Sequence, residues 1–188
     1  KKWVEAAKFL GCEHIRGNSH GTASSEEVSG FATESLSQLG EFAKSFGINI
    51  IVENHGGYSS NAKWLVNVIK NTGMDNVGTL PDFGNFCIRS KPTELTDWGS
   101  SVGGCLEEYD KYLGVKEMMP YARSVSAKTN NFDSNGNSVE TDYYKMLKII
   151  NDFGYKGYIS IEYEGEEYSE HEGILLTKQL LEKAGRNV

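Results

Sequence analysis

The chain has 188 residues, of which 38% are hydrophobic and 24% are charged, so it is long enough for one domain with a hydrophobic core and too apolar to be a disordered chain. The net charge is −7, from 26 acidic and 19 basic side chains, and an acidic surface repels phosphate backbones, which argues against a nucleic-acid partner. No apolar run approaches the roughly 20 residues that span a bilayer. We expect one domain over residues 1–188, in the cytoplasm and without a membrane partner, and leave open whether it forms a homo-oligomer.

Three cysteines, Cys12, Cys87 and Cys105, are scattered along the chain. Their number is odd and no two form a CxxC pair, so the spacing indicates neither a zinc ribbon nor a disulfide framework. We interpret them as small buried thiols in a reducing compartment.

Six segments with helical spacing of apolar residues each end at a glycine, the residue preferred just past a helix end. The first, residues 1–11, is an amphipathic helix that begins without a capping residue. The second begins with a capping-box signal, Ser24 with Glu27. The fourth is predicted from the spacing of apolar residues over 102–113. The closing glycines are Gly11, Gly47, Gly73, Gly114, Gly154 and Gly185.

A short strand candidate follows each of the first five glycines. Short apolar strands that alternate with amphipathic helices predict βα units and a parallel sheet. No glycine-rich phosphate-binding motif follows the first strand, which argues against a dinucleotide or nucleoside-triphosphate fold. The strand candidates cover residues 13–19, 48–54, 76–84, 119–128 and 158–165.

Polar residues follow nearly every strand candidate, as in a (β/α)8 TIM barrel, whose function gathers at the C-terminal ends of the strands. A complete barrel has eight strands in about 250 residues, and this chain supplies about five βα units. Because it opens inside a helix and closes with a plausible terminal one, we expect the first three units to be missing. A smaller open α/β sheet is the alternative.

Three carboxylates, Glu53, Asp82 and Glu162, stand at the ends of three different strand candidates. At one end of a barrel they would converge, and they would repel one another unless a cation or shared protons intervened. Hard oxygen ligands with few histidines suit magnesium or manganese better than copper. The pattern therefore predicts a shared polar site that holds a divalent metal.

Further candidates lie near these acids. Lys128 is expected to stabilise a developing oxyanion or to neutralise a carboxylate. Trp98, in a loop after the Asp82 strand, is a candidate for stacking on a sugar. The residues that we expect to contact substrate are Arg16, His20, His55, Asn85 and Trp98.

The motifs IIVENHGG, GTLPDFGNF, YARSVSAKTNNFD and YISIEYEG, in this order, resemble the sugar phosphate isomerase/epimerase family of xylose isomerase-like TIM barrels. The resemblance covers essentially the whole chain. It implies a divalent cation (manganese, magnesium, cobalt or zinc) on Glu53, Asp82 and Glu162. It also implies that Glu53 and Glu162 move a proton between adjacent carbons of a hydroxy ketone or aldehyde through an enediolate.

The chain departs from this family pattern at two positions. Ser126 stands where the family usually has a metal-binding histidine, and Asn85 stands where the epimerases often carry a histidine. The resemblance still implies a metal-dependent isomerase or epimerase of a sugar or sugar-like polyol. The alternatives are a lyase that performs β-elimination on 3-keto-glycosides with the same acids, and a non-catalytic sugar-binding or degenerate barrel. The related endonucleases for abasic DNA use several histidines, and the charge and the four histidines argue against that activity.

Overall fold

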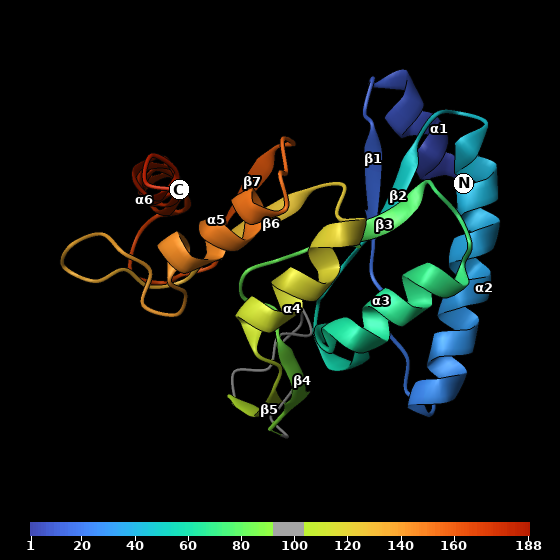
Figure 1. Ribbon diagram of the computed structural model, residues 1–188, viewed down its shortest axis with the longest axis horizontal. Helices are drawn as coiled ribbons and strands as arrows, with labels where there is room; N and C mark the ends of the chain where they lie inside the picture. Colours follow the sequence, from blue (N-terminus) through green and yellow to red (C-terminus); the bar gives the residue numbers. More distant parts are fainter. Residues whose placement is uncertain (92–103) are drawn as a thin grey trace.

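The computed structural model describes residues 1–91 and 104–188, and its centre is a row of five parallel strands (Figure 1). The first three strands pair in the order β1-β2-β3, and β6 pairs with β7. Isolated bridges from Thr79 to Ala122 and from Asp82 to Ser126 connect β3 to the segment that carries β6. The parallel strands are β1 (His14–Gly17), β2 (Asn49–Glu53), β3 (Val77–Leu80), β6 (Val125–Thr129) and β7 (Ile159–Tyr163).

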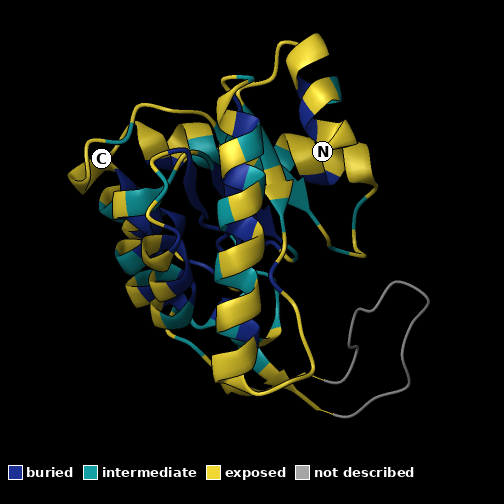
Figure 2. Ribbon diagram, turned by 90° about the vertical axis from the view of Figure 1, so that its right-hand side faces the viewer, coloured by how far each residue is buried: buried dark blue, intermediate teal, exposed yellow. Residues whose placement is uncertain are grey.

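Along the chain, a helix follows each parallel strand. The helices pack against the strands and against one another: α2 packs on β2 and on α3, and α6 packs on β7. In Figure 2, buried and exposed bands alternate along the helices, because each helix turns one face toward the sheet. The α-helices are α1 (Lys2–Phe9), α2 (Ser25–Lys44), α3 (Ala62–Asn71), α4 (Lys111–Met118), α5 (Tyr143–Asp152) and α6 (Glu170–Gly185). Two short 3-10 helices, η1 (Gly57–Ser60) and η2 (Met119–Tyr121), follow β2 and α4.

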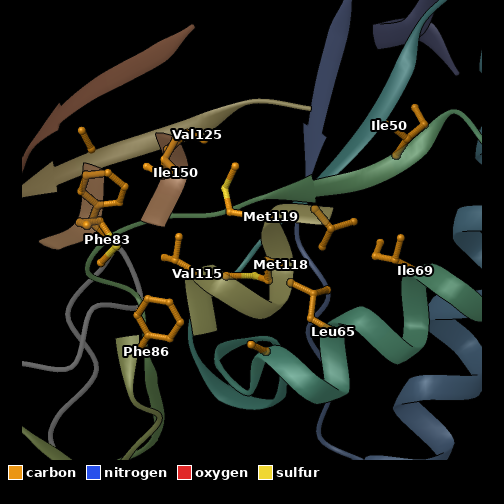
Figure 3. Packing of buried hydrophobic residues seen from close by; sticks show 14 of the residues in the cluster. Ile50, Leu65, Ile69, Phe83, Phe86, Val115, Met118, Met119, Val125 and Ile150 are labelled. Carbon is orange, nitrogen blue, oxygen red and sulfur yellow. The ribbon is translucent and has the colours of Figure 1, made fainter. Parts of the chain in front are cut away.

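The sheet and the helices enclose one apolar core (Figure 3). Strand β2 is buried along almost its whole length, as expected for a parallel strand that is covered on both faces. Met118 of α4 lies beside Leu65 of α3 in this core, and Val115 of α4 belongs to the same cluster. The βα organisation predicted from the sequence is therefore confirmed, with all five strands where they were expected.

The described strands form an open row, with β1 and β7 at its two ends, and do not close into a barrel within residues 1–91 and 104–188. The five βα units expected for part of a TIM barrel are present in order. Within the same residues, no helix combines the length and the apolar character that a bilayer-spanning segment needs.

Four of the six glycines predicted to end helices, Gly11, Gly47, Gly73 and Gly154, have a positive φ, which a glycine adopts without steric cost. Gly185 is the last residue of α6.

The prediction for the fourth helical segment was wrong, because Gly114 lies inside α4 rather than after it, and residues 105–108 form a strand. A side chain at Gly114 would come within 2.3 Å of the Phe86 ring. This glycine therefore permits the close packing of α4 on Phe86.

The interpretation of the cysteines as buried thiols was also wrong. Strands β4 (Cys87–Ser90) and β5 (Cys105–Glu108) form an antiparallel pair in the connection from β3 to α4. Their pairing brings Cys87 and Cys105 together in a disulfide, with 5.7 Å between the Cα atoms. Cys12 is free and exposed. Spacing along the chain could not reveal this bond, because β5, one of the two strands that create it, lies in a segment predicted to be helical.

Candidate active site

Three carboxylates meet at the C-terminal end of the parallel strands. Glu53 is the last residue of β2, Asp82 lies two residues past β3, and Glu162 lies near the end of β7. One carboxylate oxygen from each lies within 4.8 Å of the others. Glu53 and Asp82 are fully buried, whereas Glu162 is half-buried. The structure thus brings together the three acids that the sequence singled out.

Asp82 is held by a tight turn of its own segment. One of its oxygens, Oδ1, accepts hydrogen bonds from the backbone N–H groups of Gly84 and Asn85, each at 2.9 Å. The other oxygen, Oδ2, is buried and has no hydrogen-bond partner among the described residues. Burial raises the pKa of Asp82 to about 7, although the backbone N–H of Gly84 and the charge of Lys128 act in the opposite direction.

Glu53 receives two hydrogen bonds from residues that were predicted to contact substrate. Arg16, from the end of β1, forms an ion pair with Glu53 at 2.5 Å. Asn85 donates a side-chain N–H to the other Glu53 oxygen at 3.3 Å. Burial nevertheless raises the pKa of Glu53, and the nearby Glu162 adds to the shift, while Arg16 opposes it.

The Ser126 and Glu162 side of the cluster has fewer contacts. The Ser126 hydroxyl lies 3.4 Å from a Glu162 oxygen, at the long end of hydrogen-bond distances. Ser126 stands on β6 opposite Ser160 on β7, two residues before the pair formed by Lys128 and Glu162. In the part of the chain that the structure describes, no histidine joins the three acids in place of Ser126.

Lys128 is buried and its ammonium group is paired. It forms an ion pair with Glu164 and donates to Asn85 Oδ1 at 3.1 Å. Its stem passes over Gly84, where an added Cβ atom would lie 3.0 Å from the lysine Cδ. Glu164, which directly follows β7, therefore has a partner at the site although it is half-exposed.

The remaining residues that were predicted to contact substrate lie at the edge of the carboxylate cluster or outside the described residues. His20 and His55 pack edge to face, with 5.9 Å between ring centroids. Burial and the neighbouring His55 lower the pKa of His20. Within the described residues, no hydrogen bond joins either ring to the three acids. Trp98 lies outside the described residues.

A cavity of about 250 Å³ opens beside two of the three acids, Glu53 and Glu162. Arg16, Glu53, Ser126, Ser160 and Glu162 line it together with Leu80 and Ile161. Polar groups of both charges therefore converge on a small space, as is typical of a site for a small polar ligand.

The donor set fits a divalent cation. The three carboxylates lie close together, and the buried Asp82 Oδ2 atom has no hydrogen-bond partner within residues 1–91 and 104–188, so a cation could bind it. Oxygen ligands are those that magnesium and manganese prefer. Glu53, Asp82 and Glu162 are thus the residues that could hold such an ion.

Asn54 is a residue at this site that the sequence reasoning passed over. It is fully buried, directly after Glu53, and its side chain bonds the backbone of the Asp82 turn. The signal was present, because an amide that ends a buried strand requires polar partners.

Fold and site together place the chain in a known class. A family model described as the xylose isomerase-like TIM barrel matches residues 1–184, and the chain belongs to this family. No curated protein matches the chain.

Several solved structures resemble it at low sequence identity. A D-tagatose 3-epimerase-like protein is 20% identical, with a TM-score of 0.69 over 99% of this chain and 67% of its own. A 3-keto-D-glucoside 4-epimerase from E. coli is 13% identical, with a TM-score of 0.69 over 96% of this chain and 67% of its own. The IOLI protein, solved with a zinc atom, is 16% identical, with a TM-score of 0.68 over 99% and 67%. The chain thus spans about two thirds of these structures, and the likeness concerns the fold.

Proposed function

We propose that this protein is a metal-dependent isomerase or epimerase that moves a proton next to the carbonyl group of a sugar or sugar-like polyol. The observation that carries the proposal is the convergence of Glu53, Asp82 and Glu162 from three parallel strands. The neighbouring sugar epimerases support it, because they share the arrangement of strands that positions these acids.

Glu53 and Glu162 are the proposed proton-transfer groups. Both line the small cavity, so a substrate carbon held there would have a carboxylate on β2 and another on β7 within reach. A carboxylate with a raised pKa, such as that of Glu53, is a better base near neutral pH than an ordinary one. One acid would take a proton from the carbon, and the other would return a proton to the adjacent carbon or to the opposite face.

The cationic side chains have supporting roles in this proposal. Arg16 is bonded to Glu53 and is 46% exposed, so it can reach a substrate oxygen from the edge of the cavity. Lys128 would stabilise the negative charge that develops on the substrate oxygen, with Asn85 holding its ammonium group. His20 and His55 would contact more distant hydroxyl groups of the sugar.

A divalent ion bound by Glu53, Asp82 and Glu162 would polarise the substrate's oxygen atoms and stabilise the enediolate charge. Its oxygen-rich ligand set favours magnesium or manganese, and cobalt or zinc are the further candidates. Ser126 supplies a poorer ligand than a histidine, so we expect weaker binding than in a site with that fourth side chain.

Incorporation of deuterium from D2O tests the proposal across many sugars at once. The wild-type chain, with manganese or magnesium, is incubated with a panel of ketoses, aldoses and 3-keto-glucosides, and NMR monitors exchange at the carbon next to the carbonyl. We expect exchange on at least one sugar, which Glu162→Gln abolishes. The matched control is Glu166→Gln, an exposed acid four residues away, which should exchange normally.

The products of the same experiment separate the alternatives. A change of configuration without bond cleavage supports the epimerase, whereas release of the aglycone from a 3-keto-glycoside supports β-elimination. If no sugar incorporates deuterium but one binds in calorimetry, the chain is a non-catalytic sugar-binding barrel. Ser126, at the position of the usual metal ligand, would favour this outcome. Exchange that persists in Glu162→Gln would contradict the proposed role of this acid.

A further inference from the structure

Asn54 connects the two buried acids of the site. Glu53 is its immediate neighbour in the chain, and its side chain points to the turn that begins with Asp82. The side-chain oxygen of Asn54 accepts from the Asp82 backbone N–H at 2.7 Å. The side-chain N–H group donates to the backbone oxygens of Asp82 and Asn85 at 3.2 and 3.1 Å. All three contacts are with backbone, so they depend on the path of the turn and not on its side chains.

The three hydrogen bonds permit only one orientation of the Asn54 side-chain amide. The oxygen must face the Asp82 N–H, and both hydrogens must face carbonyl oxygens, so an exchanged amide would lose all three bonds. Asn54 is fully buried, and an unpaired buried amide is costly. These contacts thus require an asparagine at position 54 and fix the orientation of its amide group.

The hydrogen bonds of Asn54 lie just past the point where the pairing of β2 with β3 ends. The last register pair of β2 and β3 joins Glu53 to Leu80. The next residue after Leu80 is Pro81, which has no backbone N–H to donate. Asn54 therefore takes over the connection between the two strands just past their ends, at the position of the acids.

The turn that Asn54 holds also sets the direction of Asp82. Gly84 and Asn85 donate to Asp82 Oδ1, which leaves Oδ2 without a hydrogen-bond partner among the described residues, and one of the two Asp82 oxygens lies within 4.8 Å of oxygens of Glu53 and Glu162. The Asn85 backbone oxygen is held a second time, by the Ser60 hydroxyl at 2.8 Å. A shift of this turn would change the spacing between the Asp82 and Glu53 carboxylates.

We propose that Asn54 is a positioning residue that fixes the Asp82–Asn85 turn against the end of β2 and so sets the spacing of the Glu53 and Asp82 carboxylates for a divalent ion. This inference rests on the metal site of the proposed function. Residues that orient the ligands of a metal typically change its affinity about 10–100-fold when they are replaced.

Asn76 offers a matched control. It is a buried asparagine whose side chain also donates to two backbone oxygens, those of Gly40 and Ile48, at 2.9 and 3.3 Å. It precedes β3 and lies at the opposite end of this strand from Asp82. Asn54→Ala and Asn76→Ala should therefore both lower thermal stability, the second by less because its side chain makes two of these bonds and not three, and only the first should affect the site.

The experiment measures manganese affinity by calorimetry, the visible spectrum of bound cobalt, and hydrogen exchange of the Asp82 amide in the metal-free protein. For Asn54→Ala we expect at least about tenfold weaker manganese binding, an altered cobalt spectrum and at least tenfold faster Asp82 exchange. Asn76→Ala should match the wild type in all three. Asn54→Ser, which retains a small polar group, provides the same comparison if the alanine variant does not fold.

The outcomes separate this inference from the proposed function. If the wild type binds manganese and Asn54→Ala binds it equally well, the inference is overturned and the metal site stands. If the wild type binds no divalent ion, the metal site is overturned, and slow Asp82 exchange that is lost only in Asn54→Ala still supports the positioning role. Unchanged Asp82 exchange in the variant overturns that role in either case.

Discussion

The two sides of the carboxylate cluster differ in how firmly they are held. On one side, Asp82 is fixed by two backbone N–H bonds and by Asn54 on its turn, and Glu53 receives bonds from Arg16 and Asn85. On the other side, Glu162 is half-buried and has the 3.4 Å contact with Ser126. The loosely held side contains Ser126, one of the two positions where the chain departs from the family pattern, and the other position, Asn85, lies on the firmly held side. The carboxylate cluster thus has a rigid side, with Glu53 and Asp82, and a weakly held side, with Glu162.

Asp82→Asn should have the largest effect, because it replaces a carboxylate whose Oδ2 atom has no hydrogen-bond partner among the described residues and is free to bind an ion. We expect manganese affinity to fall by about 100-fold or more, beyond the 10–100-fold that is typical of a supporting residue. The metal-free variant should be more stable than the wild type at pH 8, because it no longer buries a charge. Calorimetry and thermal unfolding measure the two effects, and unchanged affinity would show that the rigid side does not bind the ion.

Ser126→His should strengthen the weakly held side. An imidazole at this position adds a ligand next to Glu162, and we expect cobalt or zinc to bind about tenfold more tightly, which is about 1.4 kcal/mol. Ser126→Ala is the control and should bind within about threefold of the wild type, because the serine contact is long. Equal affinity in all three proteins would mean that this side takes no part in binding.

The raised pKa of Asp82, on the rigid side, predicts how stability and metal affinity change with pH. The pKa of Asp82 is raised from 3.8 to about 7, so the folded metal-free chain binds this proton more tightly than the unfolded chain does. Its stability should therefore fall as pH rises from about 4 to about 7. Metal affinity should rise over the upper part of that range, because the ion displaces the proton. Calorimetry at several pH values checks this, and Asp82→Asn should show a flatter dependence.

The smallest change tests the scaffold behind Glu162 without touching the site. Thr177 of α6 and Thr129 of β6 share a buried hydroxyl contact of 2.6 Å. Thr177→Val should cost about 1–2 kcal/mol of unfolding free energy, because it leaves a buried hydroxyl without its partner. Manganese affinity should stay unchanged. A clear loss of affinity would show that helix packing, and not local contacts alone, controls the weakly held side.

The sequence predicted the strands and the three acids well because both depend on local signals. Each strand is a short apolar run, and each acid directly follows or ends such a run. The pairing of β4 with β5 was missed because the apolar spacing over 102–113 indicates a helix. Residues 105–108 form a strand instead, because they pair with β4. The contacts of Asn54 and the partner of Glu164 were missed for the same reason, since they lie 28 and 36 positions away along the chain.

The disulfide between Cys87 and Cys105 has consequences for where and how the protein is produced. Such bonds persist in oxidising compartments and are rare in the cytosol, so this bond argues against the cytoplasmic location expected from the sequence. It joins residues 18 positions apart, and in the chain-entropy model a crosslink of this size stabilises a fold by about 3 kcal/mol. Recombinant material should therefore be more heat-resistant when it is made by a secretory route than when it is purified under strong reductant. Thiol labelling followed by mass spectrometry would show one reactive cysteine, Cys12, in the first preparation and three in the second.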